Sequence, residues 1–263
     1  MEPPRYPRAV RARLRLLLGV LLLSPPTGAS AAERVLVAAA ANMAYVVGPL
    51  GAAFEREHPG VAVESEIGAS GSLVSQIANG APYDVFLSAD LEFPRRLVAM
   101  GGADGASLVT YAYGRLVLWT LRPQIGTASI ESVVRDPRVL RIAIASPGAA
   151  PYGRAAEEAL GRLGLAEAAR PKIVVGENVT QAAQFVSSGN ADAGFVAYSL
   201  VVAPNMKGRG RWIEVPAALY TPIAQGAVLT RRGAANPAGR LYLRFLTGGA
   251  AREVLVRFGY RLP

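Results

Sequence analysis

Short apolar runs alternate with amphipathic stretches along most of the chain, which is the order typical of α/β proteins. A first series predicts strands at 34–40, 61–67 and 83–88, each followed by a helical stretch. A second series of similar design predicts strands at 141–145, 172–175 and 193–197, with helices at 151–163 and 179–188. Such alternation predicts mostly parallel sheets that bind ligands at the carboxyl ends of their strands.

The two series predict two α/β lobes rather than one large sheet. A stretch rich in β-forming residues at 109–121 lies between them, and a strand at 221–230 is expected to lead back to the first lobe. A helical pattern follows at 237–258. We assign 33–112 and 220–263 to lobe 1, and 113–219 to lobe 2.

One local conflict concerns the first helix. Gly48-Pro49 predicts either a kink or an irregular turn over 43–47 before a regular helix that begins at Pro49.

The N-terminus has the order of a secretory signal peptide: basic residues, a Leu-rich run at 14–23, and small residues at 28–32. We expect residues 1–32 to be removed by cleavage near Ala31 or Ala32, which would place the mature protein in the periplasm. A membrane anchor is disfavoured because the run is shorter than the about 20 residues of a span. The segment holds five Arg and one Glu, so its removal lowers the formal charge from +9 to +5.

Composition excludes several kinds of chemistry. The 263 residues contain no cysteine, so thiolate metal sites and Cys nucleophiles are excluded. His58 is the only histidine, and it lies in a predicted helix-ending turn. The arginines are scattered and form no cluster with aromatics, which argues against a nucleic-acid partner.

The turn at 68–72, Gly-Ala-Ser-Gly-Ser, joins a predicted strand to a predicted helix. The first N–H groups of a helix lack intrahelical partners, and the helix dipole adds partial positive charge there, so such a turn can hold an anion. The alternative interpretation is that Ser70 only caps its own helix.

Three other helix starts share this pattern, at Asn42, Tyr152 and Val179. If the strand ends of both lobes meet at one cleft, the four starts would surround a compact oxyanion with neutral donors. Each also has an alternative interpretation without a ligand: a helix cap for Asn42, a packed aromatic for Tyr152, and core for Val179.

Five segments carry a resemblance to a known family. They are VLVAAAANM at 35–43, GASGSLVSQI at 68–77, GAPYDVFLSAD at 80–90, PYG at 151–153 and FLTGGAAREVLVRFGY at 245–260. With them the chain resembles the periplasmic molybdate-binding proteins of ABC importers, a class of extracellular solute-binding protein. The resemblance implies an α/β fold, the two-lobed periplasmic binding protein (type II), in which each lobe has a mixed, mostly parallel sheet flanked by helices.

The resemblance also implies a set of ligand groups. Asn42 and Ser70 would each give side-chain and backbone donors, with the backbone of Ala89 nearby, opposite Tyr152 and the backbone N–H of Val179. Some members use a Tyr where this chain has Ala197. We expect its neighbour Tyr198 to face away, since adjacent strand residues face opposite sides.

The implied function is binding of molybdate and tungstate in the interlobe cleft and delivery to the transmembrane permease subunits of an ABC importer. A cavity of fixed size would reject smaller sulfate, because each donor left unpaired costs about 1–3 kcal/mol. We further expect a monomer with no catalytic activity, no cofactor, no direct metal ligands and no nucleic-acid partner.

Alternatives remain open. The ligand could be another tetrahedral oxyanion, such as sulfate or phosphate. A secreted serine hydrolase would use Ser70, but Ser72 replaces the last Gly of G-x-S-x-G, and His58 precedes the serine instead of following it. An anion sensor fused to a regulator is disfavoured, since the sequence shows neither a DNA-binding segment nor an additional span.

Overall fold

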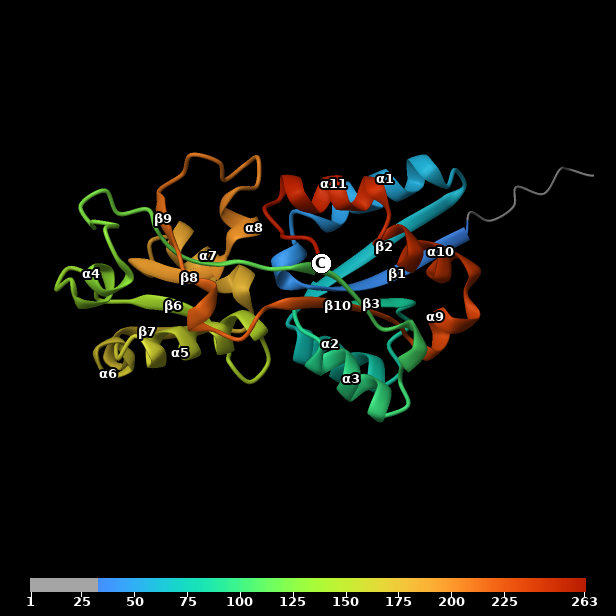
Figure 1. Cartoon of the computed structure of the whole chain (residues 1–263), viewed down its shortest axis with the longest axis horizontal. Helices are drawn as coiled ribbons and strands as arrows, with labels where there is room; N and C mark the ends of the chain where they lie inside the picture. Colours follow the sequence, from blue (N-terminus) through green and yellow to red (C-terminus); the bar gives the residue numbers. More distant parts are fainter. Residues whose placement is uncertain (1–32) are drawn as a thin grey trace, which may run out of the picture. The chain divides into compact units, whose positions relative to one another are not determined.

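The computed structural model describes residues 33–263, and the predicted signal peptide and cleavage site lie outside them. Two five-stranded sheets organise the described residues (Figure 1). The first has the order β2-β1-β3-β10-β4, with strands Glu33–Ala40 (β1), Val61–Gly68 (β2), Val85–Ser88 (β3), Val109–Tyr113 (β4) and Ala224–Leu229 (β10). The second has the order β7-β6-β8-β5-β9, with strands Leu116–Thr120 (β5), Ile142–Ala145 (β6), Ile173–Gly176 (β7), Ala193–Ala197 (β8) and Arg211–Glu214 (β9).

Both sheets have the same pattern of strand directions. β1 pairs in parallel with β2 and β3, and β6 pairs in parallel with β7 and β8. β10 in the first sheet and β5 in the second run antiparallel to the strands on either side of them. The predicted fold class, an α/β protein with two mixed and mostly parallel sheets, is therefore confirmed.

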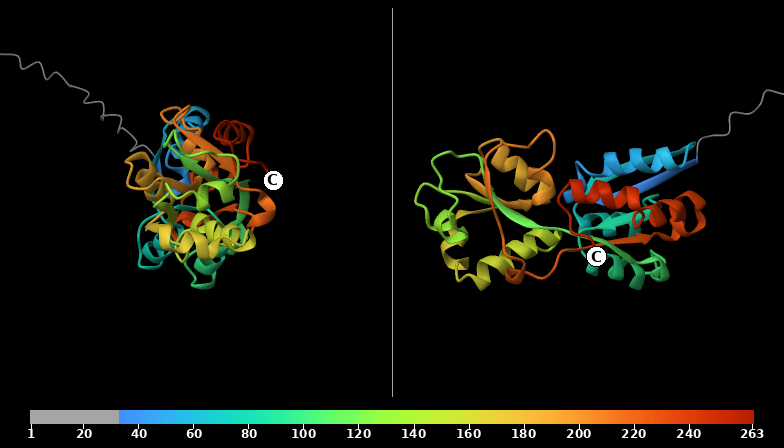
Figure 2. Two further views of the ribbon diagram at one scale, coloured as in Figure 1. Left: turned by 90° about the vertical axis from the view of Figure 1, so that its left-hand side faces the viewer. Right: turned by 45° about the horizontal axis from the view of Figure 1, so that its top comes forward.

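Two chain segments cross between the sheets (Figure 2). The first crosses at Gly114, between β4 and β5, so the β-rich stretch expected at 109–121 is split between both sheets. The second crosses over residues 215–223, between β9 and β10. The Gly114 N–H donates to the Ile223 carbonyl at 2.8 Å, which pairs the two crossing segments.

Helices cover both faces of the first sheet (Figure 1). Val47–Glu57 (α1), Pro237–Phe245 (α10) and Gly249–Arg257 (α11) share one core with Val35 and Val37 of β1. Ser70–Ala78 (α2) and Glu92–Ala99 (α3) cover the opposite face, where Ala38 lies with Phe86. The alternation along β1 thus places its apolar side chains in two cores.

The second sheet is covered in the same way. Pro151–Arg162 (α5) contacts β6 and the short helix Ala166–Ala169 (α6), whereas Val179–Ser187 (α7) contacts β6 and β8. Tyr198–Val201 (α8) follows directly after β8. Because α5 and α7 each follow a parallel strand, their N-termini lie at the carboxyl edge of the sheet.

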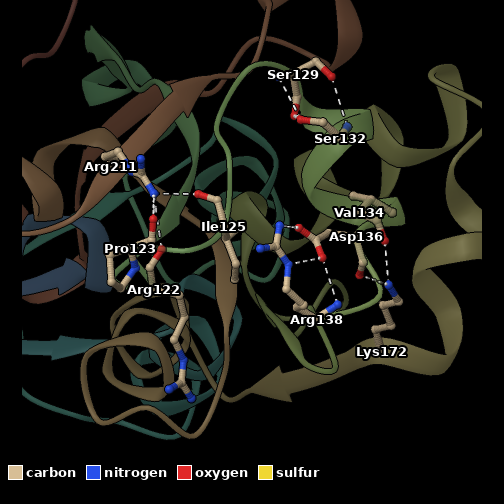
Figure 3. A network of polar contacts seen from close by, with 10 residues as sticks. All are labelled: Arg122, Pro123, Ile125, Ser129, Ser132, Val134, Asp136, Arg138, Lys172 and Arg211. Carbon is tan, nitrogen blue, oxygen red and sulfur yellow. Dashed lines mark hydrogen bonds and ion pairs between the residues drawn. The ribbon is translucent and has the colours of Figure 1, made fainter.

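A polar network fixes the long connection after β5 (Figure 3). Arg211 donates to the carbonyls of Pro123 and Ile125 at 2.6 and 2.7 Å, and Lys172 donates to those of Val134 and Asp136 at 2.8 and 3.0 Å. Hydrogen bonds from the Arg138 side chain and backbone lower the pKa of Asp136 to about 2. Basic side chains therefore supply hydrogen bonds to backbone carbonyls of this connection. The connection also contains Ile130–Arg135 (α4).

Two helix boundaries differ from the expected ones. A 3-10 turn at Ala41–Met43 precedes α1, and Pro49 lies in the first turn of α1, where its missing N–H costs little. The predicted helix at 237–258 is two helices, α10 and α11, separated near the extended residue Gly248. Among residues 33–263, no helix combines the length and the apolar character that crossing a membrane requires.

Candidate functional site

A small cavity lies where the carboxyl ends of strands from both sheets meet. Its first-lobe lining follows β1, β2 and β3, and its second-lobe lining follows β6 and β7. The residues are Ala40, Ala41, Asn42, Ala69, Ser70, Ala89, Ala150, Pro151, Tyr152, Asn178 and Val179. The structure therefore brings all five predicted site residues to one cavity; whether they bind a ligand stays a prediction.

Ser70 is buried at the start of α2, but it does not cap that helix. The capping position belongs to Ala69, and Ser70 is the first helical residue. Its Oγ accepts a hydrogen bond from the Ala89 N–H at 3.2 Å. The interpretation of Ser70 as a cap is therefore wrong. Because Ala89 uses a lone pair of the oxygen, the hydroxyl proton can still be donated to a ligand.

Asn42 is fully buried within the 3-10 turn and likewise caps no helix. Its Nδ2 donates to Gln225 Oε1 and to the Tyr260 hydroxyl, both at 2.7 Å. The amide orientation follows from the network, since Gln225 Nε2 donates to the carbonyls of Ala89 and Ile223 and so leaves Oε1 facing Asn42. Both N–H groups of this side chain are thus used within the protein, and its expected role as a donor to an anion stays a prediction.

The backbone carbonyl of Asn42 also takes part in this network of hydrogen bonds. Its carbonyl accepts from Ser199 Oγ at 2.8 Å and from the Tyr260 hydroxyl at 3.1 Å. Its Oδ1 is buried without a hydrogen-bond partner among the described residues. The side-chain N–H groups and the carbonyl of Asn42 are thus all engaged within the described residues.

Tyr152 lines the cavity from the first turn of α5. Pro151 occupies the first position of α5 and has no N–H, so the first backbone donor of this helix is that of Tyr152. The hydroxyl lies at the first crossing segment: a Cβ at Gly114 would stand 2.2 Å from it. The ring of Tyr152 therefore reaches the first crossing segment from the start of α5.

Val179 is the first residue of α7, and its N–H has no partner within the helix. The side chain of Asn178 caps the helix by accepting from the N–H groups of Thr180 and Gln181, both at 3.0 Å. The cap thus satisfies the second and third donors and leaves the first one next to the cavity. Asn178 was not among the predicted residues, although an Asn before a helix start is a recognisable signal.

Direct hydrogen bonds join the two lobes around the cavity. The Gly71 N–H donates to the Ala149 carbonyl at 2.9 Å, and the Thr180 hydroxyl donates to the Ala41 carbonyl at 2.7 Å. The structure therefore shows a state in which the helix starts of both lobes face the same small volume.

The lining has no charged side chain. Burial, and then the neighbouring tyrosines Tyr260, Tyr220 and Tyr111, raise the pKa of Tyr152 well above its ordinary value, which keeps its hydroxyl neutral. Within residues 33–263, no cluster of three His, Asp or Glu side chains is placed to hold a metal ion. The site can stabilise negative charge only through neutral donors and the N-termini of α2, α5 and α7.

Tyr198 and His58 lie away from the cavity lining. The Arg115 guanidinium stands 4.0 Å from the ring centroid of Tyr198, whose other neighbour is Trp212. His58 packs on Phe54 at the end of α1, and β2 separates it from Ser70 by roughly 23 Å of extended chain. This geometry provides no Ser-His pair for a hydrolase.

Sequence reasoning missed Gln225, Tyr260 and Ser199, which are buried and contact Asn42 or its carbonyl. A polar Gln within the apolar strand Ala224–Leu229 was the one visible signal for this group.

Fold and site together have the organisation of a two-lobed binding protein, with a small uncharged cavity between its lobes. The chain belongs to the bacterial extracellular solute-binding proteins, whose family model matches residues 35–261. It is 40% identical over 256 residues to the molybdate-binding protein ModA of Rhodobacter capsulatus, covering 97% of this chain and 98% of that protein. It is 41% identical over 252 residues to ModA of Azotobacter vinelandii, covering 95% and 98% respectively.

The solved structure of the periplasmic molybdate-binding protein of Azotobacter vinelandii is similar to this one, with a TM-score of 0.81 and 36% identity. The match covers 87% of this chain and 99% of that one. The two-lobed binding-protein fold expected from the sequence is thereby confirmed.

Proposed function

We propose that this protein is the solute-binding component of an ABC importer that binds molybdate, and also tungstate, in the cavity between its lobes. The sequence identity of 40% and 41% to two ModA proteins supports molybdate as the ligand. The observation that carries the proposal is the convergence of Ser70, Tyr152 and Val179, each at the start of a helix, on one uncharged cavity.

Neutral donors suit a fully deprotonated dianion. The hydroxyl of Ser70 and the backbone N–H groups at the cavity do not ionise at neutral pH. They can therefore donate hydrogen bonds to the anion although none of them carries a positive charge. Burial strengthens each of these hydrogen bonds, because the effective dielectric constant is lower than in water. A smaller anion would leave some donors unpaired, at a cost of about 1–3 kcal/mol for each one.

The rest of the proposal concerns transport. The protein would be exported to the periplasm and would act as a monomer, with no catalytic activity and no cofactor. Molybdate would favour the closed arrangement of the lobes, and transmembrane permease subunits would recognise that arrangement. The molybdenum would be bound as its oxyanion, through oxygen atoms, without direct metal ligands from the chain.

Titration calorimetry of the mature protein with molybdate, tungstate, sulfate and phosphate tests the function. We expect tight binding of molybdate and tungstate, and binding of sulfate and phosphate at least a hundredfold weaker. Comparable affinity for sulfate would overturn the molybdate assignment, and preferential binding of sulfate or phosphate would favour the alternative oxyanion.

A further inference from the structure

The buried side chain of Gln225 connects three parts of the molecule that meet at the cavity. It lies at the start of β10, directly after the second crossing segment, at an irregularity in the pairing of β10 with β4. Its Nε2 donates to the Ala89 carbonyl at 3.3 Å and to the Ile223 carbonyl at 3.2 Å. Its Oε1 accepts from Asn42 at 2.7 Å. One amide therefore ties the second crossing segment to two residues of the cavity lining.

The same amide also lies beside a residue of the second lobe. A Cβ placed on Gly114 would stand 2.9 Å from Gln225 Nε2 and 2.2 Å from the Tyr152 hydroxyl. Both polar atoms thus approach one glycine of the first crossing segment. Gln225 lies where the two crossing segments, the first-lobe lining and the ring of Tyr152 come together.

We propose that Gln225 is a positioning residue for anion binding, which holds Asn42 and Ala89 in register so that the Asn42 backbone N–H and the Ser70 hydroxyl fit the ligand. This inference rests on the proposed function. The chain of contacts is short: Gln225 fixes the Asn42 amide and the Ala89 carbonyl, and the Ala89 N–H orients the Ser70 hydroxyl. Gln225 does not line the cavity and acts through these neighbours.

The competing explanation is that Gln225 only satisfies two buried carbonyls and so stabilises the fold. A purely structural residue would change the melting temperature and would leave the pH dependence of binding unchanged. Its loss would also have the same effect whatever residue stands at position 42. These two differences define the experiments.

The first experiment replaces the amide by an isosteric acid, Gln225→Glu, and follows the molybdate affinity from pH 6 to pH 9. The protonated acid can still accept from Asn42 and donate to one carbonyl. The ionised acid cannot donate, so it no longer holds the Ala89 and Ile223 carbonyls. Burial raises the pKa of such a carboxyl, so it is expected to titrate within this range. We expect the affinity to fall at least tenfold as the pH rises.

The matched control is Gln76→Glu, the same change at an exposed position of α2 in the same lobe. The control and the unmodified protein should show a flat profile from pH 6 to pH 9. A flat profile for Gln225→Glu, at an affinity equal to that of the control, would overturn the proposal.

The second experiment is a double-mutant cycle of Gln225→Leu with Asn42→Ser, with circular dichroism to establish that each variant is folded. We expect Gln225→Leu to weaken molybdate binding at least tenfold in the unmodified protein, and threefold or less when Asn42→Ser has already removed its partner. Equal losses in both backgrounds would show that Gln225 does not act through Asn42. If Gln225→Leu fails to fold, the pH profile of Gln225→Glu decides the question.

The two proposals fail in different ways. Absence of molybdate binding by the unmodified protein contradicts the proposed function, and the Gln225 variants are then compared on the oxyanion that does bind. The unmodified protein can bind molybdate normally while the pH profile of Gln225→Glu is flat and the losses of affinity in the double-mutant cycle are additive. That result contradicts only the role of Gln225. A protein that binds none of the four oxyanions would overturn both.

Discussion

The Arg154 guanidinium contacts the Asp90 carboxylate across the two lobes, with Nη2 2.5 Å from Oδ2. Arg154 lies in α5 of the second lobe, and Asp90 follows β3 of the first. Arg154 also reaches Glu92 at 3.1 Å, and Asp90 accepts from the Phe93 N–H at 3.0 Å. This ion pair connects the lobes through residues that do not line the cavity, so it can favour the closed state without touching the ligand.

Replacing Arg154 should therefore weaken binding by easing the opening of the lobes. We expect Arg154→Met to reduce molybdate affinity two- to fivefold, or about 0.5–1 kcal/mol, since the side chain is about one-third exposed and solvent screens the pair. The change should appear in the dissociation rate measured by stopped flow. Arg252→Met, at an exposed position of α11, is the control. Equal dissociation rates for both variants would contradict a role for the ion pair in closure.

Ser70→Ala tests the hydroxyl at the first-lobe helix start. The substitution removes a donor to the anion and the acceptor of the Ala89 N–H, so we expect affinity to fall 10- to 100-fold, or about 1.4–2.8 kcal/mol. Calorimetry measures the loss, and the melting temperature of the ligand-free protein should change little. Ser75→Ala, on the exposed side of the same helix, should bind as the unmodified protein does. Unchanged affinity in Ser70→Ala would remove this residue from the site.

Gly114→Ala tests the close approach of Tyr152 to the first crossing segment. The added methyl group would lie 2.2 Å from the tyrosine hydroxyl, so the ring and the start of α5 have to move. We expect affinity to fall at least tenfold, and Tyr152→Phe in the same chain to restore part of it by removing the nearest atom. Gly126→Ala, where a Cβ meets nothing within 4 Å, serves as control. If the double variant binds no better than Gly114→Ala, the clash is not the cause.

Alkaline pH should destabilise the protein through its buried tyrosines. Burial raises the pKa of Tyr111, Tyr152, Tyr242 and Tyr260 above the ordinary value of 10.0. In the folded protein these tyrosines stay protonated at pH values where the tyrosines of the unfolded chain ionise. Their contribution to stability is therefore fully present below pH 10 and decreases as the pH rises beyond it. Melting temperatures measured from pH 7 to pH 11 should fall only above about pH 10. A fall that begins near pH 8 would point to other groups.

Tyr242→Phe should stabilise the protein. The Tyr242 hydroxyl is buried without a hydrogen-bond partner among the described residues. The ring centroids of Tyr242 and Phe54 are 5.1 Å apart. Removing the hydroxyl keeps the ring contact and ends the cost of an unpaired polar group, so we expect a gain of about 1 kcal/mol in the free energy of unfolding. Urea denaturation at pH 7 measures it. A loss of stability would mean that the hydroxyl has a partner in solution.

The period of the apolar residues was sufficient to predict the α/β class, because strands and helices repeat their buried positions at different intervals. It was not sufficient to separate β4 from β5, since both are β-rich and the break between them, at Gly114, depends on which sheet each strand joins. The merging of α10 and α11 into one predicted helix has a similar cause. Only Thr247, Gly248 and Gly249 interrupt the apolar pattern, and packing decides where the chain turns.

The sequence by itself determined that four helix starts follow strands, and the resemblance of its motifs selected Asn42, Ser70, Ala89, Tyr152 and Val179. Only the tertiary structure decided how these residues are used. The Ser70 hydroxyl accepts from the Ala89 N–H, the Asn42 amide donates to Gln225 and Tyr260, and the Tyr152 hydroxyl lies beside the first crossing segment. The reason is that a hydrogen bond depends on distance and direction between atoms, and Asn42 and Gln225 are 183 residues apart in the chain.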